Sequence, residues 1–96
     1  KHLNEHGGVA VVDCYATWCG PCKAIAPYVH KKAEETKILL LKVDVDKAPD
    51  LSSAYKIQAM PTFLALKGQW NNVVNTVVGG GQGNVDKVFG VAASSK

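Results

Sequence analysis

Two cysteines separated by two residues, in the segment Trp18-Cys19-Gly20-Pro21-Cys22, constrain this chain more than any other feature. The segment lies between an apolar run typical of a buried strand and a stretch with the periodicity of a helix. At this spacing Cys19 would lie at the N-terminus of the helix, where backbone N–H groups and the helix dipole lower the pKa of a thiol. Pro21 supports this placement, because proline is favoured at the first helical position. We therefore expect Cys19 to be an attacking thiolate and Cys22, one turn further on, to be the resolving thiol.

A lone C-x-x-C pair can also be half of a zinc site, which needs two further Cys or His ligands. Cys14 falls on an expected buried strand, and the three histidines show no paired ligand spacing: His2, His6 and His30. We therefore expect no bound metal, and the pair favours redox chemistry.

Length and composition indicate a single globular domain spanning residues 1–96, with 47% hydrophobic and 20% charged residues. No apolar run approaches the roughly 20 residues that span a bilayer, so we expect no membrane insertion. The net charge of +3 comes from scattered lysines, and the chain has no arginine, so we expect no nucleic-acid binding. The three cysteines and the absence of a secretory signal at the start favour a reducing compartment.

Hydrophobic periodicity predicts strands over residues 9–15, 38–45, 62–66 and 73–78. A long helix is expected from Pro21, with a kink at Pro27 because proline removes a backbone hydrogen bond. A short helix would cover residues 49 to about 55, with Asp46 as a candidate N-cap. Asn84 would cap a final helix that buries four apolar residues: Val85, Val88, Phe89 and Ala92. Strand, long helix and strand in this order predict a right-handed parallel crossover.

The order of these motifs resembles the thioredoxin family over nearly the whole chain. The matching segments are Val11-Val12-Asp13, Ala16-Thr17-Trp18-Cys19-Gly20-Pro21-Cys22-Lys23, Ile25-Ala26-Pro27, Val43-Asp44-Val45-Asp46 and Ala59-Met60-Pro61-Thr62. Disulfide isomerase domains, the nearest relatives, usually carry histidine in place of Pro21. The resemblance implies an α/β thioredoxin fold, with a central mixed β-sheet flanked by helices on both faces.

The resemblance also implies reversible dithiol–disulfide exchange with protein substrates. Cys19 would attack a substrate disulfide to form a mixed disulfide, and Cys22 would then attack Cys19 and release the reduced product. Thioredoxin reductase would recharge the pair with electrons from NADPH. The Cys19–Cys22 disulfide would therefore be the redox centre, with no cofactor bound to the chain itself.

Asp13 is an acid in an otherwise apolar strand, where burial would raise its pKa. It could simply face outward, but the resemblance places it beneath the active site as the proton acceptor for Cys22, directly or through a water. Lys42 stands at the family position that pairs loosely with this acid. On sequence alone Lys42 could equally be a surface lysine.

Pro61 matches the cis-proline of the family, which faces the two cysteines. In the cis form it would orient the Met60 backbone to pair with an extended substrate segment, a small case of strand addition. The resemblance adds a shallow apolar docking surface formed by Trp18, Gly20, Pro21, Ile57, Gly79 and Gly80. Simple packing is the alternative role for Trp18.

Three features depart from the family pattern. Cys14 replaces the usual aromatic residue, and we interpret it as a small buried hydrophobe rather than a third redox centre. The turn over residues 67–72 is about two residues longer than usual and carries Trp70, which is either a packing lid or an exposed contact. Residues 1–6 have the pattern of a helix end, so the first strand and most of the first helix of the family are lacking. Either the chain forms a homodimer through the exposed 38–45 edge, or the first residues are missing from the sequence.

Two other functions remain open at this point. A binding or scaffold subunit without turnover would not need to keep Cys19, Cys22, Asp13 and Pro61 together. A disulfide isomerase or oxidase of a secretory compartment would be less reducing, and Pro21 argues against it. We expect a cytoplasmic protein, or an organellar one if a transit peptide has been removed upstream of Lys1.

Overall fold

The computed structural model describes residues 8–68 and 72–95. The elements in chain order are β1 (Val9–Tyr15), α1 (Gly20–Thr36), β2 (Leu39–Asp44), α2 (Pro49–Ala54), β3 (Thr62–Lys67), β4 (Val73–Val78) and α3 (Gln82–Ser94). Each falls on a segment for which the sequence predicts the same kind of structure. The expected helix end at residues 1–6 and the side chain of Trp70 lie outside the described residues. No helix in the described ranges is long and apolar enough to cross a membrane.

The four strands form one mixed sheet in the order β2-β1-β3-β4. β1 and β2 are parallel, whereas β1 pairs with β3 and β3 with β4 in antiparallel fashion. β1 is central and buried on both faces, which suits its nearly continuous apolar sequence. The crossover through α1 therefore joins parallel strands, as predicted. β2 lies at an edge, with no further strand beside it in the described part of the chain.

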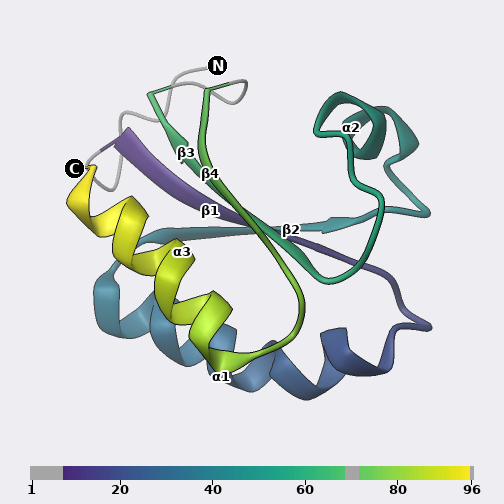
Figure 1. Ribbon diagram of the computed structural model, residues 1–96, viewed down its shortest axis with the longest axis horizontal. Helices are drawn as coiled ribbons and strands as arrows, with labels where there is room; N and C mark the ends of the chain where they lie inside the picture. Colours follow the sequence, from purple (N-terminus) through teal and green to yellow (C-terminus); the bar gives the residue numbers. More distant parts are fainter. Residues whose placement is uncertain (1–7, 69–71, 96) are drawn as a thin grey trace.

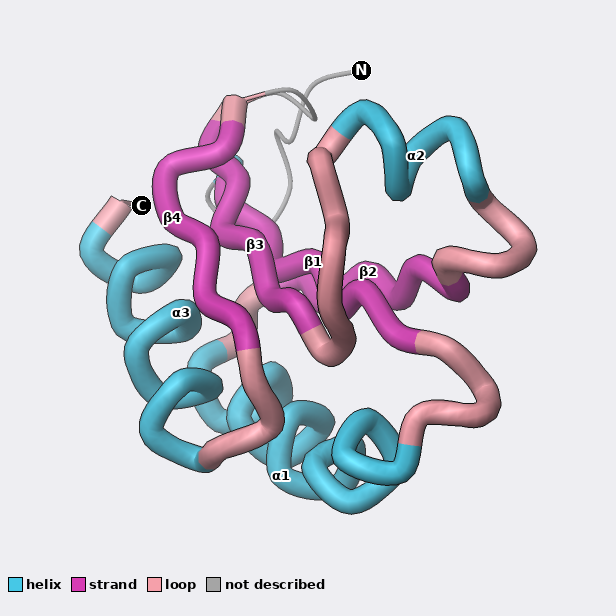
Figure 2. Tube along the Cα trace, turned by 45° about the vertical axis from the view of Figure 1, so that its right-hand side comes forward, coloured by secondary structure: helices cyan, strands magenta, loops and turns pink. Residues whose placement is uncertain are grey.

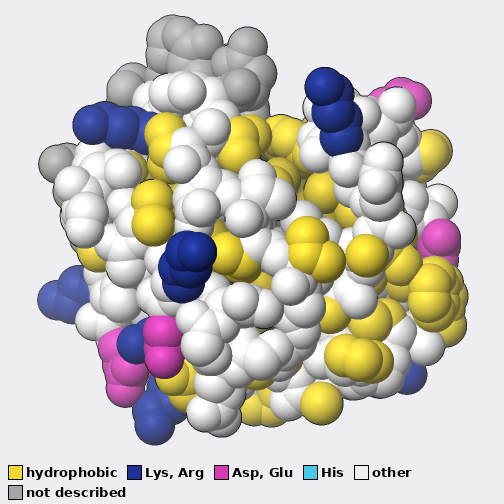
Figure 3. All heavy atoms as spheres, in the orientation of Figure 1, with side chains coloured by type: hydrophobic (Ala, Val, Ile, Leu, Met, Phe, Trp, Pro, Cys, Tyr) yellow, Lys and Arg dark blue, Asp and Glu magenta, His cyan; other side chains and the backbone are white. Residues whose placement is uncertain are grey.

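The helices lie on opposite sides of the sheet. Figure 1 shows α1 and α3 on one side and α2 on the other. The connection from α2 runs back across the sheet to the start of β3 (Figure 2), and Tyr55 and Ile57 from this connection pack onto the sheet. The apolar cluster beneath them consists of Ala10, Val12, Cys14, Leu64 and Leu66. Figure 3, in the orientation of Figure 1, shows hydrophobic side chains gathered between α2 and the start of α1, with few charged groups among them.

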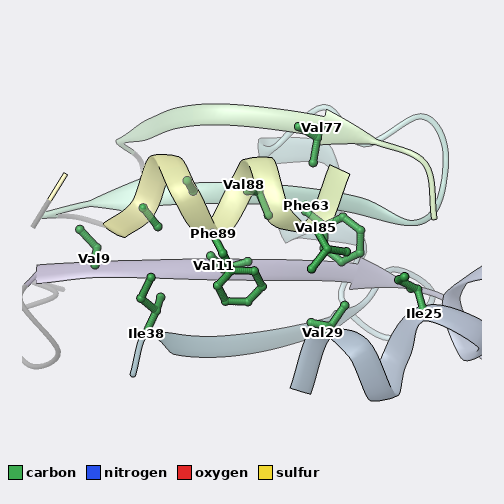
Figure 4. Packing of buried hydrophobic residues seen from close by; sticks show 12 residues of the cluster. Val9, Val11, Ile25, Val29, Ile38, Phe63, Val77, Val85, Val88 and Phe89 are labelled. Atoms are coloured by element: carbon green, nitrogen blue, oxygen red, sulfur yellow. The ribbon is translucent and has the colours of Figure 1, made fainter. Parts of the chain in front are cut away.

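The larger core lies between the sheet and the pair α1 and α3. Figure 4 shows Phe89 and Val88 of α3 directed toward Val11 and Phe63 of the sheet. All four residues predicted for the apolar stripe of α3 are buried. Full burial of each such large side chain contributes about 1.5–3 kcal/mol. This core holds α1, and therefore the cysteine pair at its start, against the end of β1.

Three details at the helix starts differ from expectation. Ala48, not Asp46, is the N-cap of α2, and Gly81, not Asn84, is the N-cap of α3. The Asp46 side chain instead accepts a hydrogen bond from the Trp18 indole, and the Asn84 side chain donates to the backbone carbonyls of Val78 and Gly79. α1 begins at Gly20, so that Pro21 is its second residue rather than its first, and the helix continues through Pro27.

Candidate active site

Cys19 and Cys22 lie at the start of α1 and form a disulfide bond. Cys19 is the N-cap of the helix, and its sulfur accepts a hydrogen bond of 3.2 Å from the backbone N–H of Cys22. The predicted placement, one cysteine at the helix start and one a turn further on, is confirmed. Both residues are only 5% exposed, so a partner can reach them only at the surface where α1 begins. An N–H group directed at this sulfur would also stabilise a thiolate there.

Asp13 lies behind Cys22 and is 3% exposed, so it does not face outward. Its Oδ1 atom is buried without a hydrogen-bond partner in the described part of the chain. Asp13 and Cys22 both line a cavity of about 280 Å³, which Thr17, Lys23 and Lys42 border as well. Burial raises the pKa of the Asp13 carboxyl, because the charged form loses its hydration.

Two basic residues moderate this rise. Lys42 is the register partner of Asp13 across β1 and β2, and its positive charge lowers the pKa of Asp13, while His30 lowers it to a smaller extent. The Lys42 ammonium also lies 5.0 Å from the centre of the Tyr15 ring, a cation–π distance. Lys42 is therefore an exposed lysine whose charge acts on the buried acid, and its role in catalysis stays a prediction.

The second side of the site is formed by the Met60-Pro61 peptide and the segment after β4. The Met60-Pro61 bond is cis, as expected. The backbone N–H of Gly79 donates to the carbonyl of Pro61 at 2.9 Å. A Cβ atom placed on Gly80 would lie 3.3 Å from Cβ of Pro21 and 3.7 Å from Cγ of Pro61. This segment therefore packs directly against the turn that holds the cysteines.

Trp18 is the most exposed large hydrophobic side chain in the described ranges, at 66%. Its indole Nε1–H donates a hydrogen bond of 2.8 Å to Oδ2 of Asp46. The ring is therefore anchored at its polar edge while its faces remain open to solvent. Of the two roles considered for Trp18, this exposure supports a contact surface rather than packing.

The thioredoxin family model matches residues 1–87. The chain belongs to the thioredoxin family. It is 53% identical to Thioredoxin-1 of Caenorhabditis elegans over 60 residues, and this match covers 62% of this chain and 52% of that protein. It is 44% identical over 80 residues to Thioredoxin H1 of Arabidopsis thaliana, covering 82% of this chain and 68% of the relative.

Solved thioredoxin structures share the fold. The reduced thioredoxin pre-protein of Schistosoma mansoni superposes with a TM-score of 0.79 at 41% identity, over 92% of this chain and 79% of that one. Among curated relatives the matched part is shorter, at 52%, 45% and 64% of the proteins from Caenorhabditis elegans, Drosophila melanogaster and Coprinus comatus. The chain therefore spans about half to two thirds of the length of these thioredoxins.

Most of the residues that the thioredoxin resemblance implied come together at this site. Gly20 and Pro21 are exposed at the start of α1, and Met60 packs against the cluster formed by Ala16, Cys19 and Cys22. Ile57 is the exception, because it packs onto the sheet with Ala10, Val12 and Cys14 rather than beside the disulfide. Cys14 is a buried free thiol, as expected for a small hydrophobe. No group of three or more His, Cys, Asp or Glu residues in the described ranges could hold a metal ion.

Several residues of the site were not found by sequence reasoning. The sequence pattern indicates a helix cap for Asp46, and for His30 it raises only the question of a metal ligand. Asn84 was also interpreted as a cap, although its side chain bonds to the segment that packs on Pro21. These partners are distant in sequence, and no local pattern marks them. The resemblance to the family includes Asp46 in the matching segment Val43-Asp44-Val45-Asp46 but assigns it no role at the site.

Proposed function

We propose that this chain is a protein disulfide reductase that works by dithiol–disulfide exchange. The observation that supports this most directly is the Cys19–Cys22 disulfide at the start of α1, beside a cavity that contains a buried carboxyl group. In the reduced form the Cys19 thiolate attacks one sulfur of a substrate disulfide, and one substrate thiolate leaves. The Cys22 thiolate then attacks Cys19, the second substrate thiolate leaves, and the Cys19–Cys22 disulfide forms. Two electrons pass from the cysteine pair to the substrate.

Asp13 is proposed as the acceptor of the Cys22 proton. A carboxyl with a raised pKa is a better base at neutral pH than an ordinary aspartate, and it shares a cavity with Cys22 through which a water can pass. The positive charge of Lys42 is proposed to limit the rise in the pKa of Asp13 that burial causes. Both residues act on the second step, because they lie on the Cys22 side of the disulfide.

Substrate binding is proposed at the surface formed by Trp18, Gly20, Pro21, Met60, Pro61, Gly79 and Gly80. The backbone N–H and C=O of Met60 make no hydrogen bond with other described residues. An extended substrate segment could therefore pair with Met60, as strand addition requires. Ile57 lies away from this surface and would contribute only indirectly.

The proposed source of electrons is NADPH acting through a thioredoxin reductase, with no cofactor bound to this chain. The cytoplasm is the compartment in which such a system would hold the pair reduced. Expression of a fluorescent fusion of the complete gene product, followed by imaging, tests the compartment. Signal confined to an organelle would contradict it.

A homodimer through β2 is a second partner proposal. β2 is an edge strand with half-buried Leu39, Leu41 and Val43, and such edges favour pairing with another strand. In an antiparallel pair centred on Val43, Lys42 of one copy would lie opposite Asp44 of the other, which is a favourable cross-strand pair. Sedimentation equilibrium should show a dimer that Leu41→Lys weakens. A monomer whose β2 amides exchange slowly would overturn this proposal.

The decisive experiment is reduction of insulin driven by NADPH and thioredoxin reductase. Wild type, Cys19→Ser and Cys22→Ser are compared. We expect turnover by wild type, none by Cys19→Ser, and accumulation of a mixed disulfide with Cys22→Ser. A folded wild type without turnover would instead favour a scaffold subunit. Efficient oxidation or isomerisation of substrates, with poor reduction, would favour the isomerase or oxidase class.

A further inference from the structure

Three consecutive glycines, residues 79–81, join β4 to α3 and form part of the site. We call them the triglycine segment. Gly79 has φ +118°, a conformation that residues with side chains rarely adopt, and its N–H donates to the carbonyl of Pro61. Gly80 lies close to Pro21, on the turn that holds the cysteines. Glycine runs have large conformational freedom and no side chains with which to pack. The position of this segment must therefore be fixed by its neighbours.

The carboxamide of Asn84 bonds to the start of the segment. Its Nδ2 atom donates to the carbonyl of Val78 at 3.1 Å and to that of Gly79 at 3.4 Å. The backbone N–H of Asn84 also donates to the carbonyl of Gly81 at 3.1 Å. One residue of α3 thus holds both ends of the triglycine segment.

Gly79 and Asn84 also fit each other sterically. A Cβ atom placed on Gly79 would lie 3.0 Å from Nδ2 of Asn84, so the carboxamide occupies the space beside Gly79 where a side chain would project. Helix capping does not explain Asn84, because Gly81 is the N-cap of α3 and Asn84 is the third residue of the helix.

We infer that Asn84 is a positioning residue for substrate binding: by holding the triglycine segment against Pro61 and Pro21, it sets the affinity for extended polypeptide substrates. This inference rests on the proposed reductase function. Asn84 is distant from the chemical step, because its contacts are to the backbone carbonyls of Val78, Gly79 and Gly81 and not to the disulfide. It should therefore affect substrate affinity without affecting bond exchange at Cys19.

The test compares Asn84→Asp and Asn84→Ala with the control Gln82→Glu. The Asp variant replaces the donor with an oxygen that repels both carbonyls, while the negative charge in the first turn of α3 is favourable to the helix. The control adds the same charge in the same turn, and Gln82 makes no side-chain hydrogen bond to the triglycine segment in the described structure. Loss of folding is therefore not expected in any of the three variants.

For insulin reduction we expect Asn84→Asp to raise KM by about three- to tenfold, the range that corresponds to the loss of one or two ordinary hydrogen bonds. The kcat should change little, and Asn84→Ala should show a smaller effect than Asn84→Asp. Reduction of a small aromatic disulfide, which offers no extended backbone, should match wild type. Gln82→Glu should match wild type in both assays. An unchanged KM for insulin, or equal losses with both substrates, would overturn the inference.

Amide hydrogen exchange gives a second measurement that does not depend on turnover. The Gly79 amide, which donates to Pro61, should exchange faster in both Asn84 variants and at the wild-type rate in Gln82→Glu. If wild type reduces no disulfide at all, the proposed function fails, and insulin binding measured by titration replaces KM. Unchanged exchange at Gly79 would overturn the inference whether or not the protein is a reductase.

Discussion

Asp13 and Lys42 are paired on neighbouring strands and line the same cavity behind Cys22. The pair is unequal, because Asp13 is buried whereas Lys42 is exposed and also lies over the Tyr15 ring. Desolvation therefore outweighs the attraction of the lysine, and the pKa of Asp13 is raised. A carboxyl in this state costs stability when it ionises, and the same raised pKa is what would make it an effective base for the proposed transfer of the Cys22 proton.

The stability of the oxidised protein should depend on pH through Asp13. In the unfolded chain Asp13 ionises near its ordinary pKa of 3.8, whereas the folded protein retains the proton to higher pH. The free energy of unfolding is therefore highest below the pKa that Asp13 has in the unfolded chain. It decreases as the pH rises through the pKa that Asp13 has in the folded protein. Asp13→Asn removes this loss, so the free energy of unfolding of this variant relative to wild type should increase between pH 4 and pH 7. Urea unfolding of both proteins at pH 4 and pH 7 checks this. If the difference in free energy of unfolding between Asp13→Asn and wild type is the same at both pH values, the prediction is contradicted.

The rate of substrate release should depend on the same carboxyl. Without an acceptor for the Cys22 proton, Asp13→Asn should slow insulin reduction at neutral pH by about tenfold. This is less than a directly bonded general base contributes, because the proton crosses a cavity. The deficit should shrink at higher pH, where Cys22 ionises without help.

Lys42→Met provides the matched control for this prediction. Removal of the positive charge raises the pKa of Asp13 further, so the ascending limb of the rate against pH should move to higher pH without loss of the maximum. If Asp13→Asn leaves the pH profile unchanged, Asp13 is not the proton acceptor.

The fold follows closely from local patterns in the sequence. β1 is predicted over its observed residues because its apolar run is continuous, and α3 is predicted because Val85, Val88, Phe89 and Ala92 repeat at helical spacing. The family resemblance adds the position of Asp13 beneath the site and the cis form of Pro61, which spacing alone does not indicate and which the structure confirms, while the roles of both residues stay predictions. The confirmed features share one cause, since periodic burial and short motifs are both visible within a few residues.

Polar side chains were harder to place. Asp46 and Asn84 both precede or begin helices and both fit the pattern of a cap, yet their partners are the Trp18 indole and the carbonyls of Val78 and Gly79. Trp18 and Asp46 are 28 residues apart, so their contact depends on how β1 and β2 pair. A side chain with several competing acceptors or donors is assigned only when the tertiary fold is known.

Two glycines near the start of α3 should respond to alanine in opposite directions. A Cβ on Gly80 would lie 3.3 Å from Cβ and 3.4 Å from the carbonyl oxygen of Pro21, so Gly80→Ala must displace the triglycine segment or the cysteine turn. A Cβ on Gly83 would meet nothing within 4 Å, and Gly83 is helical. We expect Gly80→Ala to lower the free energy of unfolding by about 1 kcal/mol and Gly83→Ala to raise it by about 0.5–1 kcal/mol. Denaturant unfolding measures both, and a stabilised Gly80→Ala would contradict the close packing.

The thiol of Cys14 should report on opening of the fold rather than take part in redox exchange. Cys14 is fully buried, and burial together with the nearby Asp13 raises its pKa to about 12. At pH 8 it is therefore protonated, and no reagent can reach it in the folded protein. With the Cys19–Cys22 disulfide intact, we expect no reaction with Ellman's reagent under native conditions and reaction of this thiol in concentrated guanidinium chloride.

At intermediate denaturant concentrations the rate of Cys14 labelling should follow the population of unfolded protein, because only opened molecules expose the thiol. Cys14→Ala supplies the control, since its oxidised form should release no colour even when it is unfolded. Rapid labelling of the native protein would show that the sheet face beneath Tyr55 and Ile57 opens locally. In that case Cys14 would be accessible to the same disulfides as Cys19, and its assignment as an inert core residue would be wrong.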